Sequence, residues 1–418
     1  PLLYLLSRMK PRANSQAILL GNYAGSALDD IINDPNATPA KTLIRNFREK
    51  ALEYVACTDF DPQQFKADAA TQAANIKGIV SELRCHYDLD KAILEPSFVC
   101  EKLGLQGRVD LMTTDLKLLV EQKSGRNIFI ERNTNNGHGA RVVEKHYVQV
   151  LLYYGILYYN FHVRHSDISL LYSKFPLPDG LVSVTNLLQL VYEALRFRNE
   201  AVALEFDIAD NGLDNILPQL TEQTLNVAHM AGFFYDTYLR PSLLGLITPL
   251  HQLSPLERAY LSRMTRFAVR ENLMSKVGAV EGTGNSVADL WHMPLAEKKE
   301  TGNIYTGLRL LPSASSASST LTFSIPDQGI DFLPNFRRND MVYLYAYPTG
   351  EEPDVRKALL FKGSVSELHT DRISIKLADR QQNTDIYNHL PYDGHPLASA
   401  SFSWCIEHAS SDVGGSAG

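Results

Sequence analysis

The spacing of apolar residues changes along this chain, so neither the helix period nor the strand period fits its whole length. Between residues 38 and 84, apolar side chains recur at the spacing of helix turns, whereas residues 105–172 combine short alternating segments with one long helical pattern. After residue 320 the period becomes two. The sequence therefore predicts an α/β core followed by a separate all-β domain.

Two helices are expected before the first strands. Thr38 followed by Pro39 is typical of a helix start, and Asp61 followed by Pro62 repeats the signal. Each segment then carries apolar residues on one face. The apolar stripe of the first helix comprises Leu43, Ile44, Phe47, Ala51, Leu52 and Val55, and the buried face expected for the second comprises Phe65, Ala69, Ala73, Ile76, Val80 and Leu83.

The next segment predicts strands, a helix and a further strand. Residues 105–113, 117–123 and 127–131 indicate three short strands separated by turns. A long helix is expected at about 142–160, and a fourth strand at 168–172. This order of elements is typical of an α/β core.

The C-terminal part predicts a stalk and a barrel. Ser254 and Glu257 form the capping box of a helix that we interpret as the stalk and expect to run through Glu271. Beyond the Ser/Ala-rich segment 313–319, strands are expected at 320–325, 341–347, 358–365 and 373–377, and they indicate a small β-barrel. The predicted organisation is an α/β domain over residues 1–250, a helical stalk over 251–300, the barrel over 301–410 and a disordered tail over 411–418.

Composition limits the possible functions. The formal net charge of −7 gives no global basic signature, so any contact with nucleic acid must come from a local patch. No apolar run reaches the ~20 residues that a bilayer requires. Because residue 1 is Pro and the chain ends in Gly and Ser, we expect it to be a piece of a longer protein. The four cysteines form no CxxC pair, which argues against a zinc ribbon or a disulfide framework and favours the cytoplasm; they are Cys57, Cys85, Cys100 and Cys405.

One constellation of charged residues suggests catalytic chemistry. Asp110 ends the motif Gly-Arg-Val-Asp on one predicted strand, and Glu121 begins Glu-Gln-Lys on the next. Mg²⁺ prefers hard oxygen ligands and keeps several waters, so these two carboxylates and the backbone carbonyl of Gln122 predict an open metal site. Strand alternation places Lys123 on the same face as Glu121, where its ammonium can orient or deprotonate a water and stabilise a phosphorane.

Repulsion between the two carboxylates helps to decide between interpretations. At a separation of ~4 Å and an effective dielectric of ~20, they would repel by about 4 kcal/mol. A structural core gains nothing from that repulsion, whereas a bound cation removes it. The alternative is that Asp110 merely ends a strand, while Glu121 and Lys123 form an ordinary exposed ion pair.

Further residues extend the constellation. Glu95 is expected to complete the metal shell; the alternative is a solvated acid before Pro96. Gln149 and Tyr153 share one face of the predicted helix, with His146 one turn earlier, and are expected to hold the scissile phosphate and a stacked base. The alternative for Tyr153 is packing within a tyrosine-rich helix.

The order of these residues resembles the RecB-like branch of the PD-(D/E)xK nucleases. The segments LGLQGRVDLM and VEQKSG and the helix EKHYVQVLLYYGIL are similar to the nuclease half of flap-processing nuclease-helicases, over about residues 30–175. The resemblance implies a restriction-endonuclease-like α/β core with extra helices, which uses Mg²⁺ or Mn²⁺ to cleave single-stranded or flapped DNA. By this resemblance, Asp110 and Glu121 bind the metal, Lys123 is the catalytic lysine, and Gln149 and Tyr153 position the DNA. We also expect Glu95 and Gln122 among the metal ligands, and Arg108 and His146 among the residues that contact the nucleic acid.

The later part resembles the barrel that precedes the motor of superfamily 1 helicases, in the segments RRNDMVYLYAY and KGSVSELHTDRISIKL. This implies a helicase motor in the same full-length chain. The barrel cations are expected to guide a DNA strand, the alternative being scattered solubility charges. They are Arg337, Arg338, Lys357, Lys362, Arg372 and Lys376.

Two departures from the family pattern matter. Helix 62–84 lacks the histidine ligand that is common in RecB-like nucleases, and His86 lies just beyond it. Only Cys405 follows the core, so no iron–sulfur cluster is expected. The glycines of segment 282–284 are not followed by the Lys and Ser/Thr of a Walker loop, and His138 lies in a polar loop, so neither predicts a site.

The sequence therefore predicts a metal-dependent deoxyribonuclease that acts in replication, repair or defence, with no ATPase motor in this segment. Two alternatives remain open. One is a catalytically inactive DNA-binding or scaffolding module with a nuclease fold, against which the intact Asp110, Glu121 and Lys123 speak. The other is a stand-alone repair or restriction enzyme, which the barrel and the fragment-like ends disfavour.

Overall fold

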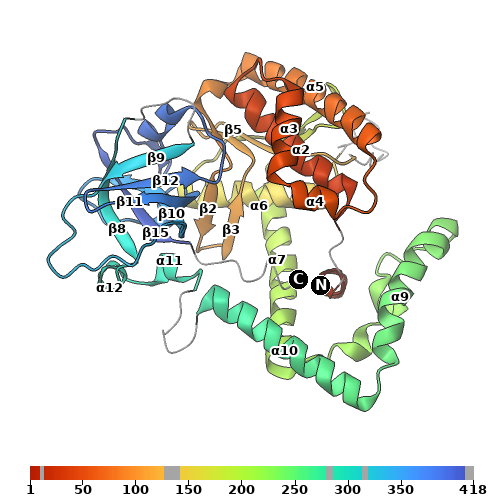
Figure 1. Ribbon diagram of the computed structural model, residues 1–418. Helices are drawn as coiled ribbons and strands as arrows, with labels where there is room; N and C mark the ends of the chain where they lie inside the picture. The colour runs from red at the N-terminus through yellow and green to blue at the C-terminus, as the bar shows by residue number, and fades with distance from the viewer. Residues whose placement is uncertain (10–13, 127–141, 279–285, 313–318, 410–418) are drawn as a thin grey trace. The chain divides into compact units, whose positions relative to one another are not determined.

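A computed structural model describes residues 1–9, 14–126, 142–278, 286–312 and 319–409 (Figure 1). The chain divides into two compact units. The helical unit is formed by residues of Pro1–Ala13 and Tyr192–Asp289. The core unit comprises Asn14–Val191 and Leu290–Ala409, and it contains every predicted site residue. The predicted strand at 127–131, His138 and the glycines of segment 282–284 lie outside the described residues.

The core unit contains a mixed five-stranded sheet. Only β5 and β6 pair in parallel, and α6 (Glu144–Phe161) connects them, as a parallel connection requires. The predicted helix at 142–160 and strand at 168–172 are thereby confirmed. The strand order is β1 (Ala92–Leu94), β4 (Leu111–Thr113), β5 (Leu118–Lys123), β6 (Asp167–Tyr172) and β7 (Leu181–Val184).

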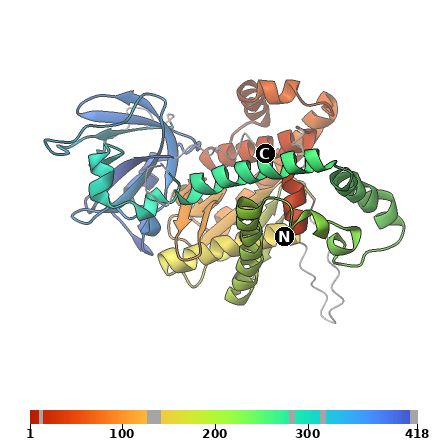
Figure 2. The ribbon, with the colours of Figure 1, turned by 90° about the horizontal axis from the view of Figure 1, so that it is seen from below.

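Helices cover the two faces of this sheet (Figure 2). α2 (Gln16–Asn33) and α5 (Pro62–His86) pack on one face, and α6 lies on the other. All six residues of the predicted α5 face are buried. The Asp61 carboxylate accepts hydrogen bonds from the backbone N–H groups of Gln63 and Gln64, which caps α5 as predicted.

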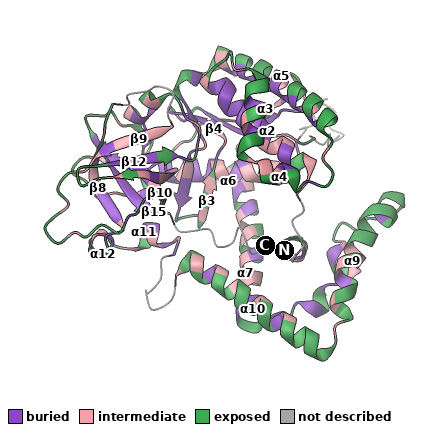
Figure 3. Cartoon of the chain, in the orientation of Figure 1, coloured by how far each residue is buried: buried purple, intermediate pink, exposed green. Residues whose placement is uncertain are grey.

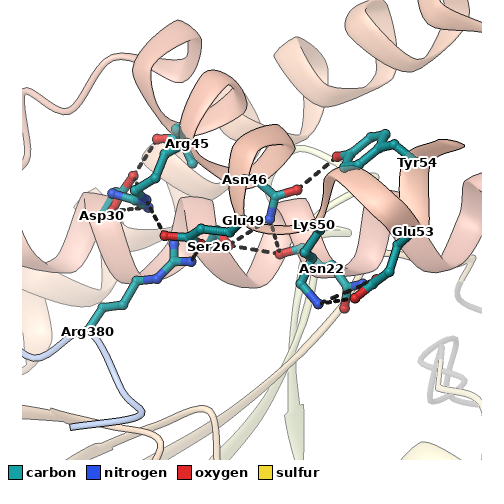
Figure 4. A network of polar contacts seen from close by, with 11 residues as sticks. Asn22, Ser26, Asp30, Arg45, Asn46, Glu49, Lys50, Glu53, Tyr54 and Arg380 are labelled. Carbon is teal, nitrogen blue, oxygen red and sulfur yellow. Dashed lines mark hydrogen bonds and ion pairs between the residues drawn. The ribbon is translucent and has the colours of Figure 1, made fainter. Parts of the chain in front are cut away.

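The prediction of one continuous helix over 38–55 was wrong. The chain forms α3 (Pro39–Glu49) and the short α4 (Ala51–Val55), and Thr38 makes no side-chain cap. Much of the apolar stripe is exposed, with Leu52 at 85%. The face that packs on α2 is polar instead: Asn46 donates to Ser26 Oγ (3.1 Å) and accepts from the Tyr54 hydroxyl (2.8 Å), within the network that Figure 4 shows.

The predicted strand at 105–113 is also interrupted. β3 (Leu105–Arg108) pairs with β2 (Ser97–Cys100) in a separate two-stranded sheet, and β4 joins the main sheet. The hairpin bends where Glu95 N donates to the Asp110 carbonyl (3.1 Å). Glu95 has a φ of +50°, and the following Pro96 has no N–H to donate. The bend therefore places two predicted site residues at one corner.

A closed six-stranded barrel follows, so the predicted small β-barrel is confirmed. The four strands expected from the sequence are present. The chain also supplies β8 (Ile304–Leu310) and β15 (Phe402–His408), which had not been predicted. Both sides of β15 are buried, including the polar Ser403 and Glu407. The barrel order is β10 (Met341–Pro348), β11 (Phe361–Leu368), β12 (Arg372–Leu377), β9 (Thr320–Ser324), β8 and β15.

Barrel and sheet belong to the same compact unit because several bonds join them. Ser97 and Leu360 exchange backbone hydrogen bonds of 2.9 Å, and Arg356 pairs with Glu101 at 2.8 Å. Gln381, in the loop after β12, accepts from Leu94 N (2.9 Å) on the edge strand β1. Figure 3 shows how burial is distributed over these elements.

The helical unit confirms the predicted capping box. Ser254 Oγ accepts from Glu257 N while the Glu257 carboxylate accepts from Ser254 N, and the helix runs past the expected end to Val277. No helix in the described part of the chain is long and apolar enough to cross a membrane.

The remaining helices of the two units include α1 (Leu2–Met9), α7 (Leu188–Asn211), α8 (Glu222–Leu225), α9 (Arg240–His251), α10 (Pro255–Val277), α11 (Asp289–His292) and α12 (Leu295–Glu300), the last of which belongs to the core unit.

Candidate active site

Backbone geometry brings Asp110 and Glu121 together. Asp110 lies at the hairpin bend, immediately before β4, and Glu121 lies on the adjacent strand β5. The backbone N–H of Gln122 donates to Asp110 Oδ2 at 2.7 Å. This bond fixes the Asp110 carboxylate beside β5, on the strand that carries the other two catalytic candidates.

Two side chains, one from β5 and one from α6, donate hydrogen bonds to the Glu121 carboxylate. Lys123 Nζ donates to Glu121 Oε1 at 2.7 Å, and Gln149 Nε2 donates to the same oxygen at 2.8 Å. Gln149 Nε2 also donates to the Tyr153 hydroxyl at 2.9 Å. Glu121 is only 4% exposed, and its second oxygen, Oε2, is buried without a hydrogen-bond partner. The strand and helix periodicities thus bring these residues together.

Burial and mutual repulsion shift the pKa values of the carboxylate pair. Burial is the main cause that raises the pKa of Asp110 to about 7, and the neighbouring Glu121 raises it further; the Gln122 N–H and Lys123 act in the opposite direction. Burial also raises the pKa of Glu121, against the effect of Lys123. Adjacent carboxyl groups with raised pKa values, here the half-buried Asp110 and the buried Glu121, are often found at catalytic or metal-binding positions.

Gly107 makes room for Tyr153. A Cβ atom at Gly107 would lie 2.6 Å from Cε1 of the Tyr153 ring, closer than any side chain tolerates. The glycine of the Gly-Arg-Val-Asp motif therefore allows α6 to bring this ring against β3. Burial, followed by the charge of Glu121, raises the pKa of Tyr153 to about 12, so the phenol keeps its proton.

Glu95 and Arg108 form an ion pair beside the central group. Arg108 Nη1 lies 3.1 Å from Glu95 Oε2, and the Arg108 side chain is more than half exposed. Glu95 contributes to the raised pKa of Asp110, although no direct bond joins the two side chains. Glu95 is therefore near the carboxylate pair but is engaged by a cation.

The side chains of Gln122 and His146 make hydrogen bonds outside the carboxylate pair. The Gln122 side chain donates to Ser173 Oγ at 2.9 Å, so only its backbone faces Asp110. His146 Nδ1 lies 3.1 Å from the Tyr172 hydroxyl. Burial and the positive charge of Lys123 lower the pKa of His146 to about 4, so it is neutral at pH 7.

Two buried carboxylates were missed by the sequence analysis. Asp29, on α2, is 8% exposed, and its pKa lies well above the usual range because of burial and the charge of Glu95. Asp379, in the loop after β12, is 5% exposed; burial raises its pKa to about 7, and Glu95 adds to the shift. The adjacent acids Asp29 and Asp30 within an otherwise apolar helix were the one available signal.

The carboxylates of Asp110 and Glu121 suit a metal ion that keeps most of its water ligands. Among the described residues, no group of three or more His, Cys, Asp or Glu side chains forms a complete metal shell. Asp110 and the unpartnered Oε2 of Glu121 offer two carboxylates. Mg²⁺ is commonly held by one or two carboxylates with waters and substrate oxygens, so these two residues suffice.

Comparison with known proteins adds no assignment. No protein-family model matches this chain, and no curated protein matches it at a significant level. The functional interpretation therefore depends on the residues of the site and on their geometry.

Proposed function

We propose that this chain is a Mg²⁺- or Mn²⁺-dependent deoxyribonuclease with a restriction-endonuclease-like core of the RecB-like type, acting on single-stranded or flapped DNA. One observation carries the proposal: Asp110 and Glu121 are held side by side with raised pKa values, and Lys123 is hydrogen-bonded to Glu121. The order of strands, helix and parallel strand around them is compatible with such a core.

Each residue has a role that its position supports. Asp110 and Glu121 would hold the metal, which polarises the phosphate and lowers the pKa of a bound water. Lys123 projects from the same strand face as Glu121 and orients the attacking water or stabilises charge on the phosphorane. Gln149 and the protonated Tyr153 hydroxyl hold a phosphate oxygen beside it.

The alternative, a catalytically inactive scaffolding module, explains fewer of the contacts in this site. A purely structural cluster explains the ion pairs of Lys123 and Arg108. It leaves Glu121 Oε2 buried with no partner, which folded proteins rarely tolerate. A cation at that oxygen removes the difficulty.

We propose further that the complete protein carries a helicase motor and acts in the cytoplasm.

The test is cleavage of end-labelled single-stranded and flapped DNA with Mg²⁺ or Mn²⁺. Asp110→Asn and Lys123→Ala should each abolish cleavage while circular dichroism stays unchanged. Lys117→Ala is the matched control, because Lys117 lies just before β5 and is largely exposed. Cleavage by Asp110→Asn at the wild-type rate would refute the proposal.

A further inference from the structure

Part of the outer surface of the barrel combines hydroxyl groups with cations. Along β9 and β12 the inward residues are apolar and buried, for example Phe323 and Ile375, while the alternate residues face outward. The same alternation continues onto neighbouring β11 and β8. The resulting hydroxyl–cation face comprises Arg309, Thr320, Thr322, Ser324, Lys362, Ser364, Ser366, Arg372 and Lys376, while Ser374, between Arg372 and Lys376, is buried.

Strand register arranges these residues in rows. Arg309 and Arg372 both pair with Ser324, from opposite sides. In a second row Lys376 stands between Thr320 and Ser364. With ~4.8 Å between strands and ~3.4 Å per residue, the cations of the two rows are spread over roughly 15 Å. The rows thus present positive charges separated by hydroxyl donors.

The four cations of this face lack an acidic partner within the described part of the chain. Arg309, Lys362, Arg372 and Lys376 form no ion pair with any residue that the structure describes. Two exposed acids lie beside them: Glu367 on β11, directly opposite Ser374 of β12, and Asp371 at the β11–β12 turn. In the same part of the chain, by contrast, Lys298 pairs with Glu407, and Arg356 pairs with both Asp354 and Glu101. Unpaired cations gathered on one face of a chain with net charge −7 provide charge complementarity to a polyanion.

We propose that the hydroxyl–cation face binds the phosphate backbone of a single DNA strand, without selecting its bases. Lysine, arginine, serine and threonine supply the contacts that position a backbone. None of the members of the face is aromatic, so it offers no stacking platform for bases. The choice of DNA as the polyanion rests on the proposed nuclease function.

The structure divides the six barrel cations predicted from the sequence into those that belong to the face and those that lie outside it. Lys362, Arg372 and Lys376 belong to the face. Lys357 instead lies 4.0 Å from Asp393. Arg337 and Arg338 are exposed in the turn before β10, outside the strands that carry the face, and therefore provide matched controls.

The test measures binding of a labelled oligodeoxythymidine by fluorescence anisotropy, without divalent metal so that no cleavage occurs, over a range of salt concentrations. Arg372→Gln combined with Lys376→Gln should reduce the slope of log affinity against log salt by ~1.4, since each phosphate contact on a single strand contributes ~0.7. Arg337→Gln combined with Arg338→Gln should leave the slope unchanged. Oligomers of mixed sequence should bind with the same affinity as oligodeoxythymidine.

A wild-type slope in the Arg372/Lys376 variant, with the fold intact by circular dichroism, would overturn the inference. An equal reduction in the control variant would also overturn it, because only net charge would then matter. Equal or tighter binding of a duplex through the same two residues would refute the choice of a single strand. The binding assay contains no divalent metal and does not depend on cleavage. If the wild-type chain binds DNA as expected but does not cut it in a separate assay with Mg²⁺, only the proposed nuclease function is refuted.

Discussion

Gly107 and Tyr153 are in direct contact across β3 and α6, and the contact leaves no space for a side chain on the glycine: a Cβ there would lie 2.6 Å from the ring. The Tyr153 hydroxyl accepts a hydrogen bond from Gln149, which in turn donates to Glu121. A displacement of the Tyr153 ring would therefore reach the Glu121 carboxylate through these two hydrogen bonds.

We therefore expect Gly107→Ala to displace the Tyr153 ring and to reduce both stability and cleavage. Overpacking of this kind typically costs about 1–3 kcal/mol. Thermal unfolding and the cleavage rate measure the two effects. Gly25→Ala in α2 is the control, since a Cβ there meets nothing within 4 Å. Wild-type behaviour of Gly107→Ala in both assays would show that the contact has no functional consequence.

A second prediction concerns divalent metal. Mg²⁺ should raise the unfolding temperature, because a ligand that binds only the native state stabilises it. Glu121→Gln should lose this response, since the unpartnered Oε2 is replaced by a neutral group. Glu144→Gln, an exposed substitution in the first turn of α6, should retain it. A Mg²⁺ response that survives in Glu121→Gln would place the ion elsewhere.

A third prediction concerns pH. Burial raises the pKa of Asp379 from 3.8 to about 7, so between these values the native state holds a proton that the unfolded chain releases. Stability should therefore fall as pH rises through this window, by up to ~4 kcal/mol for a shift of this size. Asp379→Asn should remove that part of the loss, so it should stabilise the metal-free protein more at pH 8 than at pH 5. Denaturant unfolding at both pH values measures the difference, and an equal effect at both would contradict the shift.

Local periodicity predicted the centre of the site but not its surroundings. Glu121 with Lys123, and Gln149 with Tyr153, share a face because of strand and helix repeats, which are visible in the sequence. Asp379 is distant in the sequence and reaches the sheet only because the barrel closes with β8 and β15. The apolar stripe of α3 and α4 misled the prediction because a polar network, centred on Asn46, fills the interface with α2.

The last prediction concerns Gln381, through which the barrel holds the edge of the sheet. Its side chain is 2% exposed; it accepts from Leu94 N at 2.9 Å and donates to the Ala92 carbonyl at 3.3 Å. Gln381→Leu leaves both backbone groups of β1 unpaired, which should cost about 1–3 kcal/mol. Because Glu95 directly follows β1, the hairpin bend that fixes Asp110 should loosen as well.

The Leu94 amide should then exchange its hydrogen faster, and cleavage should fall while most of the protein is still folded. Gln382→Leu is the matched control, since the neighbouring Gln382 side chain is exposed. Unchanged exchange at Leu94 in Gln381→Leu would show that the barrel loop does not support the edge strand. If the loop does support it, deletion of the barrel would weaken the sheet itself, and a loss of cleavage after such a deletion would not by itself demonstrate a lost DNA contact. Single substitutions in the complete chain are therefore needed to separate the barrel's support of the site from its binding of DNA.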